Sequence, residues 1–166
     1  QSMRMRMRKS GLTFMAHIPE QLPLINADDA DIETLVLNLL DNAIKYTPPG
    51  GTIHFVVSSD EQHCTITCSD NGPGIPAEDI PHIFDRFYRV DKSRSRRRGQ
   101  EGLGSGAGLG LSIVKALVER NHGKITVRSE IGNGTSFTVY LPIASPQPGN
   151  SAPNLEQSTE TPAISP

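Results

Sequence analysis

The chain has no tryptophan and only two cysteines, and each shortage excludes a class of protein. The absence of Trp removes a common aromatic anchor for bases, sugars and membrane interfaces. Cys64 and Cys68 do not have the spacing of a disulfide scaffold or of a Cys/His metal site. They alternate with Ile66 along a strand-like run, so we expect all three side chains to be buried on one sheet face. Two thiols without a framework are typical of a reducing cytosol.

Long apolar runs are also missing. No stretch approaches the ~20 apolar residues that a membrane-spanning helix needs, and no signal peptide is visible. We therefore expect a cytoplasmic piece without direct membrane contact. The 166 residues have the length of one domain and start at Gln1-Ser2, so we expect a fragment of a longer protein.

Charge of one sign does not dominate either. The net charge of −2 gives no global attraction to nucleic acid, and we predict no nucleic-acid partner. The charge is uneven, however: residues 4–9 and 89–98 together hold ten of the 16 Lys and Arg, and residues 99–110 hold six of the 15 glycines. This clustering indicates local sites rather than a uniformly basic surface.

Hydrophobic periodicity predicts one α/β domain with helices on one face of a mixed or antiparallel sheet. The first predicted helix begins after an N-cap at Asp28 or Asp29 and ends before Pro48. The second is followed by the sequence Asn-His-Gly at 121–123, and we expect Gly123 to be its C-cap. The predicted strands are 12–18, 52–58, 63–69, 125–130 and 135–141, the second helix is 109–120, and 77–88 form a short helix or turn.

The two ends of the chain lack this patterning. Residues 1–10 alternate Met and Arg, which fits a frayed terminus, an amphipathic strand or the end of a removed helix, and we expect no chemistry of their own there. From residue 144 onward Pro, Ser, Thr and Gln dominate, so we predict a disordered tail over 144–166.

The first helix carries an unusual polar stripe. Asn38, Asp41, Asn42 and Lys45 lie on one side of a helical wheel drawn at 100° per residue. Asn is a mediocre helix former, so two in mid-helix suggest a functional role, but the stripe taken alone is better explained as a solvated helix face.

Two glycine-rich segments follow. Residues 70–76 (DNGPGIP) form a loop directly after a strand, where glycine lets the backbone approach a flat ligand. Residues 104–111 run into the second helix, whose free N–H groups suit a phosphate. Neither G-x-x-x-x-G-K-[ST] nor G-x-G-x-x-G is present, which disfavours P-loop and dinucleotide folds. The basic run at 89–98 is either solvated or a phosphate or partner contact.

The order of these segments resembles the catalytic and ATP-binding domain of sensor histidine kinases, over nearly all of residues 11–143. Five motifs carry the resemblance: residues 38–46 (NLLDNAIKY) resemble the N box, 70–75 (DNGPGI) the first glycine box, 84–89 (FDRFYR) the F box, 106–111 (GAGLGL) the second glycine box, and 132–135 (GNGT) the last hairpin.

The resemblance implies the two-layer Bergerat sandwich and a role for each matched residue. Asp70 would accept from the adenine amino group, Asn42 would hold Mg²⁺, Lys45 and Arg89 would face the phosphates, and Tyr46 and Tyr88 would flank the nucleotide. Residues 1–10 would come from an upstream dimerisation region and 89–107 would be the ATP lid. The remaining ATP-binding positions would be Asn38, Gly72, Gly74, Ile75, Gly106, Gly108, Leu109, Gly110, Leu111 and Thr135.

The implied reaction is transfer of the γ-phosphoryl group of ATP to a histidine on a dimerisation domain, and from there to a response regulator. Gyrase-like relatives have a Glu where this chain has Asn38, and an amide cannot deprotonate water, so we expect slow hydrolysis. Asp41 is a candidate proton acceptor. None of the chain's five histidines has the acceptor pattern, so we expect no autophosphorylation of this chain alone. A non-catalytic nucleotide sensor and a gyrase- or chaperone-like ATPase are the alternatives.

Overall fold

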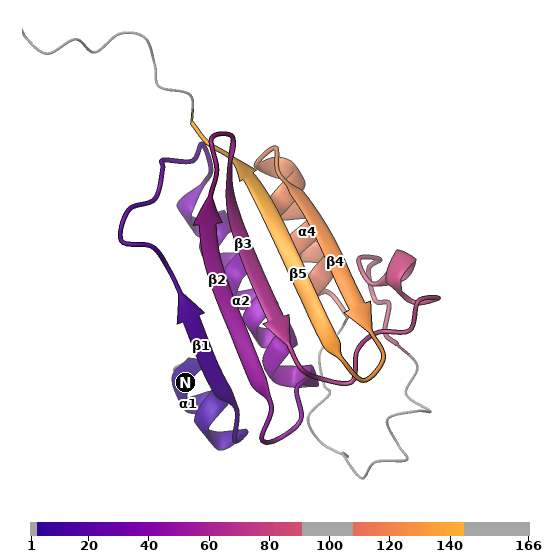
Figure 1. The fold of residues 1–166 in the computed structure, drawn as a ribbon. Helices are drawn as coiled ribbons and strands as arrows, with labels where there is room; N and C mark the ends of the chain where they lie inside the picture. Colours follow the sequence, from indigo (N-terminus) through magenta and orange to yellow (C-terminus); the bar gives the residue numbers. More distant parts are fainter. Residues whose placement is uncertain (1–2, 91–107, 145–166) are drawn as a thin grey trace, which may run out of the picture.

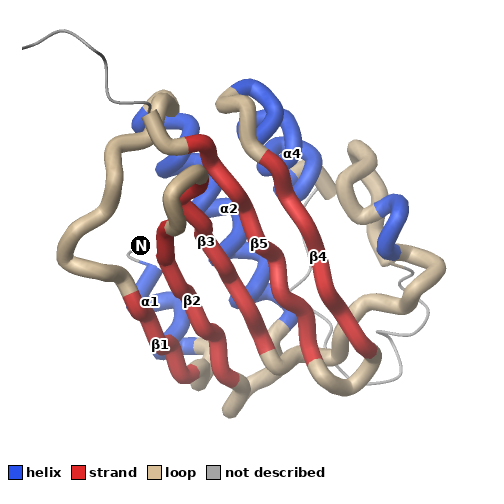
Figure 2. Tube along the Cα trace, turned by 45° about the horizontal axis from the view of Figure 1, so that its top comes forward, coloured by secondary structure: helices blue, strands red, loops and turns tan. Residues whose placement is uncertain are grey.

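The structure, a computed structural model, describes residues 3–90 and 108–144. Two helices cover one face of a five-stranded sheet (Figures 1 and 2). The elements run in the order α1 (Met3–Lys9), β1 (Thr13–His17), α2 (Asp29–Tyr46), β2 (Thr52–Ser59), β3 (His63–Asp70), the short 3₁₀ helix η1 (Ile80–His82), α4 (Gly110–Arg120), β4 (Lys124–Glu130) and β5 (Gly134–Pro142).

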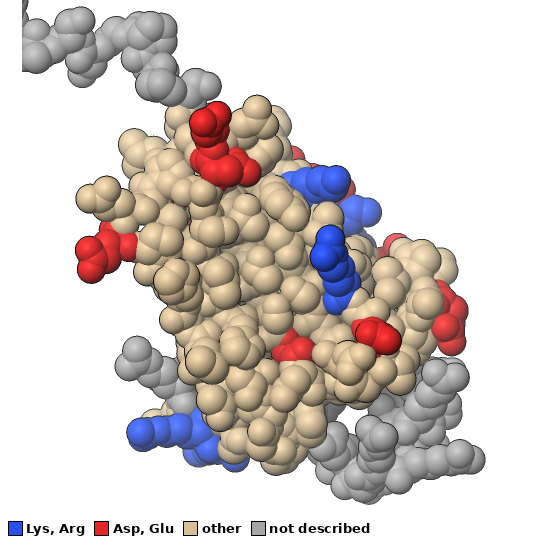
Figure 3. All heavy atoms as spheres, viewed as in Figure 1, with Lys and Arg blue, Asp and Glu red and all other residues tan. Residues whose placement is uncertain are grey.

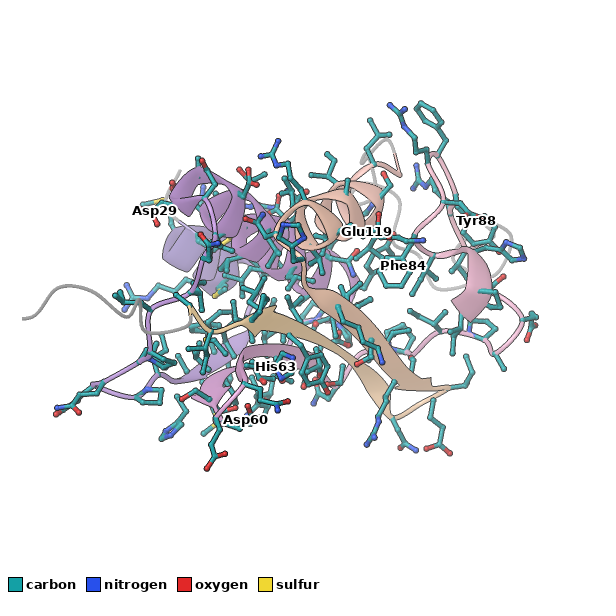
Figure 4. All side chains as sticks on the ribbon, turned by 90° about the horizontal axis from the view of Figure 1, so that it is seen from above. Asp29, Asp60, His63, Phe84, Tyr88 and Glu119 are labelled. Carbon is teal, nitrogen blue, oxygen red and sulfur yellow. The ribbon has the colours of Figure 1, made fainter. Side chains whose placement is uncertain are left out.

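The sheet has the strand order β1-β2-β3-β5-β4 and is mixed, as predicted. β1 pairs with β2 in parallel, and the other three pairings are antiparallel. In the register of β3 and β5, Asp70 lies opposite Thr135, so the end of β3 meets the start of β5. The predicted two-layer α/β sandwich is confirmed, and its layers are seen edge-on in Figure 4.

The core lies between the sheet and the helices α2 and α4. Period-2 alternation turns every second strand residue inward, and the helices contribute an apolar stripe at helical spacing. Each fully buried aliphatic side chain contributes ~1.5–3 kcal/mol. The predicted burial of Cys64, Ile66 and Cys68 is confirmed, with 5%, 5% and 2% of each residue exposed. The fully buried large side chains are Leu35, Leu39, Ile53, Val114, Val118, Val139 and Leu141.

The opposite sheet face carries hydroxyl side chains rather than a second helical layer. Thr67 and Thr138 lie 3.4 Å apart between their hydroxyl oxygens, and Ser69 and Ser136 lie 2.9 Å apart. Figure 3 shows few charged side chains over the central strands of this face. Helices α2 and α4 therefore both lie on the other side of the sheet.

Polar contacts join the start of α2 to the end of α4. Asp28 is the N-cap of α2, and its carboxylate accepts from the Asp31 N–H at 3.1 Å. The buried carboxylate of Asp31 forms an ion pair with Arg120 and accepts from the Asn121 amide at 2.8 Å. Asn121 in turn accepts from the Asp28 N–H at 3.0 Å. These contacts hold the start of α2 against the end of α4.

The C-terminus of α4 corrects one prediction. His122, not Gly123, adopts the left-handed conformation, with φ 56°. The N–H of His122 donates to Glu119 O at 3.0 Å and that of Gly123 to Val118 O at 2.8 Å, the bonding pattern of a Schellman motif. Glycine is required at 123 for a different reason, because a Cβ there would lie 2.5 Å from Tyr140 O.

The N-terminal segment resolves the alternatives left open for residues 1–10. Met3–Lys9 form a helix, and Met7 is 5% exposed within the core, so neither a strand nor a frayed end describes this segment. Positions 91–107 of the predicted lid and 145–166 of the predicted tail lie outside the described residues. Across residues 3–90 and 108–144, no helix is both long and apolar enough to cross a membrane.

Candidate functional site

A pocket of about 550 Å³ lies between α1, α2, the segment after η1 and the start of α4. It gathers the whole polar stripe predicted on the first helix, so the stripe faces a cavity. The lining residues are Arg6, Lys9, Ser10, Asn38, Asp41, Asn42, Ile44, Lys45, Tyr46, Ile83, Tyr88, Gly108, Leu109, Gly110, Leu111 and Ile113.

The wall formed by α2 supplies most of the polar groups. The Asn38 amide donates to Thr34 O at 2.8 Å, one helical turn back. Asp41 forms an ion pair with Arg6 of α1. The Lys45 ammonium lies 4.9 Å from the centroid of the Tyr46 ring, a cation–π distance. The wall therefore offers amide groups, a carboxylate already paired with a cation, and a lysine.

The start of α4 forms the opposite wall. α4 begins at Gly110, so the N–H groups of its first turn have no partner within the helix and suit an anion. A Cβ at Gly110 would lie only 3.2 Å from the Asn38 amide oxygen. The absence of a side chain at Gly110 therefore lets the start of α4 approach α2 closely. Gly108 has φ +71° and accepts from the Phe87 N–H at 3.0 Å. The second glycine segment is thus joined directly to the predicted F box.

The F-box segment lies beside α4 (Figure 4) and contributes to the lining of the pocket. Phe84 packs edge-to-face on Phe137 of the core, with ring centroids 6.3 Å apart. Tyr88 lines the pocket, and its hydroxyl donates to the Asp79 carboxylate at 2.7 Å. Phe87, between them, has φ 66° and is 67% exposed. Arg89 does not line this pocket.

Asp70 lies in a neighbouring, more open hollow of about 430 Å³, which Thr135 also lines. Its carboxylate accepts from the backbone N–H groups of Gly72, at 2.8 Å, and Thr135. Burial raises the pKa of Asp70, and the two N–H groups partly offset that rise. A Cβ at Gly72 would lie 2.9 Å from Tyr46 O, so the first glycine loop contacts the end of α2.

The structure therefore sorts the predicted site residues into two adjoining groups. Those of α2, Tyr88 and residues 108–111 share the pocket, whereas Asp70 and Thr135 lie in the hollow and Gly72, Gly74 and Ile75 in the loop beside it. Gly106 lies outside the described residues.

Three lining residues of the N-terminal segment were missed: Arg6, Lys9 and Ser10. The signal was present, because Arg6 and Lys9 are three apart and share a face once the segment is helical. The apolar lining residues Ile44, Ile83 and Ile113 carry no sequence signal that separates them from core residues.

A mixed sheet, two covering helices and a polar pocket beside the glycine segment that begins α4 define an α/β domain of the two-layer sandwich class. The family model described as histidine kinase-, DNA gyrase B-, and HSP90-like ATPase matches residues 27–145. The chain belongs to this family, as the catalytic and ATP-binding domain of a sensor histidine kinase.

Individual relatives agree. The adaptive-response sensory kinase SasA of Synechococcus sp. (strain JA-2-3B'a(2-13)) is 42% identical over 139 residues, 83% of this chain and 35% of the relative. A mycobacterial sensor histidine kinase structure, MprB, is 30% identical with a TM-score of 0.66, covering 84% of this chain and 89% of that one. Full-length ShkA, solved in complex with AMPPNP, is 28% identical with a TM-score of 0.72, covering 87% and 28%. The chain thus spans about a third of SasA's length.

Proposed function

We propose that the pocket binds Mg²⁺-ATP and that the domain transfers the γ-phosphoryl group to a histidine outside this chain. The observation that carries the proposal is the convergence of Asn38, Asp41, Asn42 and Lys45 on one cavity with the N-terminus of α4. A lysine and free helix N–H groups together suit the charge of a triphosphate. Asp70, at the end of β3, would accept from the adenine amino group, with Thr135 beside it.

The flanking contacts follow from the same placement. Tyr46 and Tyr88 line the pocket and would flank the nucleotide. Arg89 does not line it, and its contact to the phosphates is proposed on the family motif alone. The glycine segments at 72–75 and 108–111 would let the backbone approach the base and the phosphates closely. Gly106 is proposed on the family motif alone.

Magnesium fits this site as an ion carried by the nucleotide. Among residues 3–90 and 108–144, no group of three His, Cys, Asp or Glu could hold a metal ion. Mg²⁺ is usually held by substrate phosphates and only one or two protein groups, and the Asn42 amide oxygen is the group we propose. When bound, the ion neutralises charge that develops on the phosphates.

The residues favour transfer over hydrolysis. In the proposed step, an imidazole nitrogen of the acceptor forms a bond to the γ-phosphorus, and the bond from that phosphorus to the β,γ-bridging oxygen breaks, which releases ADP. Asn38 carries an amide that cannot deprotonate water, which disfavours a gyrase-like ATPase. Asp41 is the proposed acceptor of the imidazole proton, once its carboxylate is released from Arg6.

The wider setting is also a proposal. We infer that the acceptor histidine lies on dimerisation helices elsewhere in the full-length protein and that a response regulator receives the phosphoryl group. Supply of ATP and two unpaired, buried thiols suit a cytoplasmic location.

Calorimetric titration with ATP and Mg²⁺ tests the binding site. Lys45→Ala removes one charged contact to phosphate, worth ~1.5–3 kcal/mol, so the ATP affinity should fall about 10- to 100-fold. Lys115→Ala is the matched control, because Lys115 is an exposed α4 residue that does not line the pocket. Equal affinities of the two variants, or no binding by the unaltered chain, would refute the proposed site.

A further inference from the structure

Three backbone segments meet without intervening side chains where β3 ends. Figure 1 shows the β4–β5 turn beside this end of the sheet. A Cβ at Gly134 would lie 1.9 Å from Asp70 O, and a Cβ at Gly74 would lie 2.1 Å from Glu130 O. The end of β3, the first glycine loop and the closing hairpin therefore touch backbone to backbone.

One hydroxyl group joins the loop to the hairpin. Ser129 Oγ accepts from the Ile75 N–H at 2.8 Å and donates to Gly134 O at 2.9 Å. It also lies 2.8 Å from the Thr135 hydroxyl oxygen. A serine hydroxyl has one proton and two lone pairs. Because its proton goes to Gly134, the Thr135 hydroxyl is the donor in the third bond, and the bonding capacity of Ser129 is fully used.

The same two segments supply the N–H groups that hold Asp70. One comes from Gly72 in the loop, and the other comes from Thr135 in the hairpin. Ser129 bonds to the loop three residues after Gly72 and to both Gly134 and Thr135 of the hairpin. None of these contacts involves the Asp70 side chain. Ser129 therefore affects the Asp70 carboxylate only by holding the two segments whose N–H groups donate to it.

We propose that Ser129 is a positioning residue for base recognition, holding the Asp70 carboxylate and Thr135 in the arrangement that selects the exocyclic amino group of adenine. The inference rests on the proposed function, in which Asp70 accepts from that amino group. Without the Ser129 hydroxyl, the loop and hairpin can separate, and the carboxylate loses its defined direction. Selectivity for adenine should then fall more than binding of the triphosphate.

The test compares ATP with inosine triphosphate, in which an oxo group replaces the amino group. Dissociation constants are measured by calorimetry with Mg²⁺ for the unaltered chain, Ser129→Ala, Ser129→Cys and Thr138→Val. Thr138 is the matched control, because it lies in the same strand as Thr135, its hydroxyl lies 3.4 Å from that of Thr67 on the open sheet face, and it does not line the hollow of Asp70. Ser129→Cys keeps the shape with weaker hydrogen bonds, and it carries the comparison if Ser129→Ala does not fold.

We expect Ser129→Ala to weaken ATP about 3- to 10-fold with little change for inosine triphosphate, on the scale of one neutral hydrogen bond. Ser129→Cys should change the ratio in the same direction, and Thr138→Val should leave it unchanged. An unchanged ratio in the folded Ser129 variants would overturn the inference, even if both nucleotides bind more weakly. If the unaltered chain does not discriminate between the nucleotides, the adenine contact proposed for Asp70 fails, and the inference fails with it.

Discussion

Replacing Gly134 by alanine probes the backbone contact on which the Asp70 end of the site depends. Gly134 has φ +90°, and Gly132, in the same turn, has φ +85°. Nothing lies within 4 Å of a Cβ built at Gly132, whereas a Cβ at Gly134 would lie 1.9 Å from Asp70 O. The two glycines thus share a positive φ and differ in the space around them.

The difference sets the expected magnitudes. A left-handed conformation costs a non-glycine residue ~1–2 kcal/mol, which is the whole cost expected for Gly132→Ala. Forcing an extra carbon into a packed site adds ~1–3 kcal/mol, so Gly134→Ala should lower the free energy of unfolding by ~2–5 kcal/mol. The clash also pushes the hairpin away from β3. The Thr135 N–H then leaves the Asp70 carboxylate, and ATP affinity should fall.

Urea unfolding gives the two free energies, and calorimetry on the folded fraction gives the ATP affinities. We expect Gly134→Ala to cost at least ~1 kcal/mol more than Gly132→Ala and to be the variant that loses ATP affinity. Equal destabilisation by the two substitutions, or unchanged ATP binding by Gly134→Ala, would refute the reasoning.

Three further predictions concern buried polar groups and thiols. Burial raises the pKa of Asp70 above its unfolded value, so its ionisation opposes folding as pH rises through the folded pKa. Asp70→Asn should therefore raise the melting temperature at pH 7, and this gain should disappear below the ordinary aspartate pKa of about 3.9. The same substitution should weaken ATP binding. A melting temperature at pH 7 no higher than that of the unaltered chain would contradict the prediction. Asp31→Ala should lower the free energy of urea unfolding by ~2–4 kcal/mol and Arg120→Ala by ~1–2 kcal/mol, because the Asp31 carboxylate is buried and the Arg120 side chain is 66% exposed. A larger loss of stability in Arg120→Ala than in Asp31→Ala would contradict this reasoning. Burial raises the pKa of both thiols, that of Cys68 to about 12, and both residues are almost inaccessible, so a thiol reagent at pH 8 should label Cys64 and Cys68 only after denaturant is added. Rapid labelling of the native protein would show that the strand is accessible.

Much of the fold could be predicted because local patterns and tertiary packing agree. The apolar spacing of α2, the alternation of β2 and β3, and the N-cap Asp28 each depend on neighbours close in sequence. The cap of α4 was misassigned because a glycine signals either a left-handed residue or a close approach, and Gly123 serves the second purpose. The strict alternation of Met and Arg in residues 3–8 has the period of a strand, yet the segment is a helix in which Met7 is buried and Met5 is exposed, so packing of Met7 overrides the local pattern.

The site was predictable only within single elements. The stripe from Asn38 to Lys45 follows from helix geometry, and the structure places it on the pocket. The pairing of Arg6 with Asp41 spans 35 residues and depends on how α1 packs against α2. A local sequence pattern cannot predict such a contact. The same holds for Ser129, whose partners come from a loop and a turn distant from one another in the chain.

Phosphoryl transfer in trans tests the central claim most directly. The chain is incubated with γ-labelled ATP, Mg²⁺ and a panel of separately purified helical dimerisation domains that bear an acceptor histidine. We expect acid-labile label on a dimerisation domain, none on this chain, full activity in Lys115→Ala and strongly reduced activity in Lys45→Ala. Stable label on this chain itself, rapid ATP hydrolysis without transfer, or equal transfer by the two lysine variants would contradict the account.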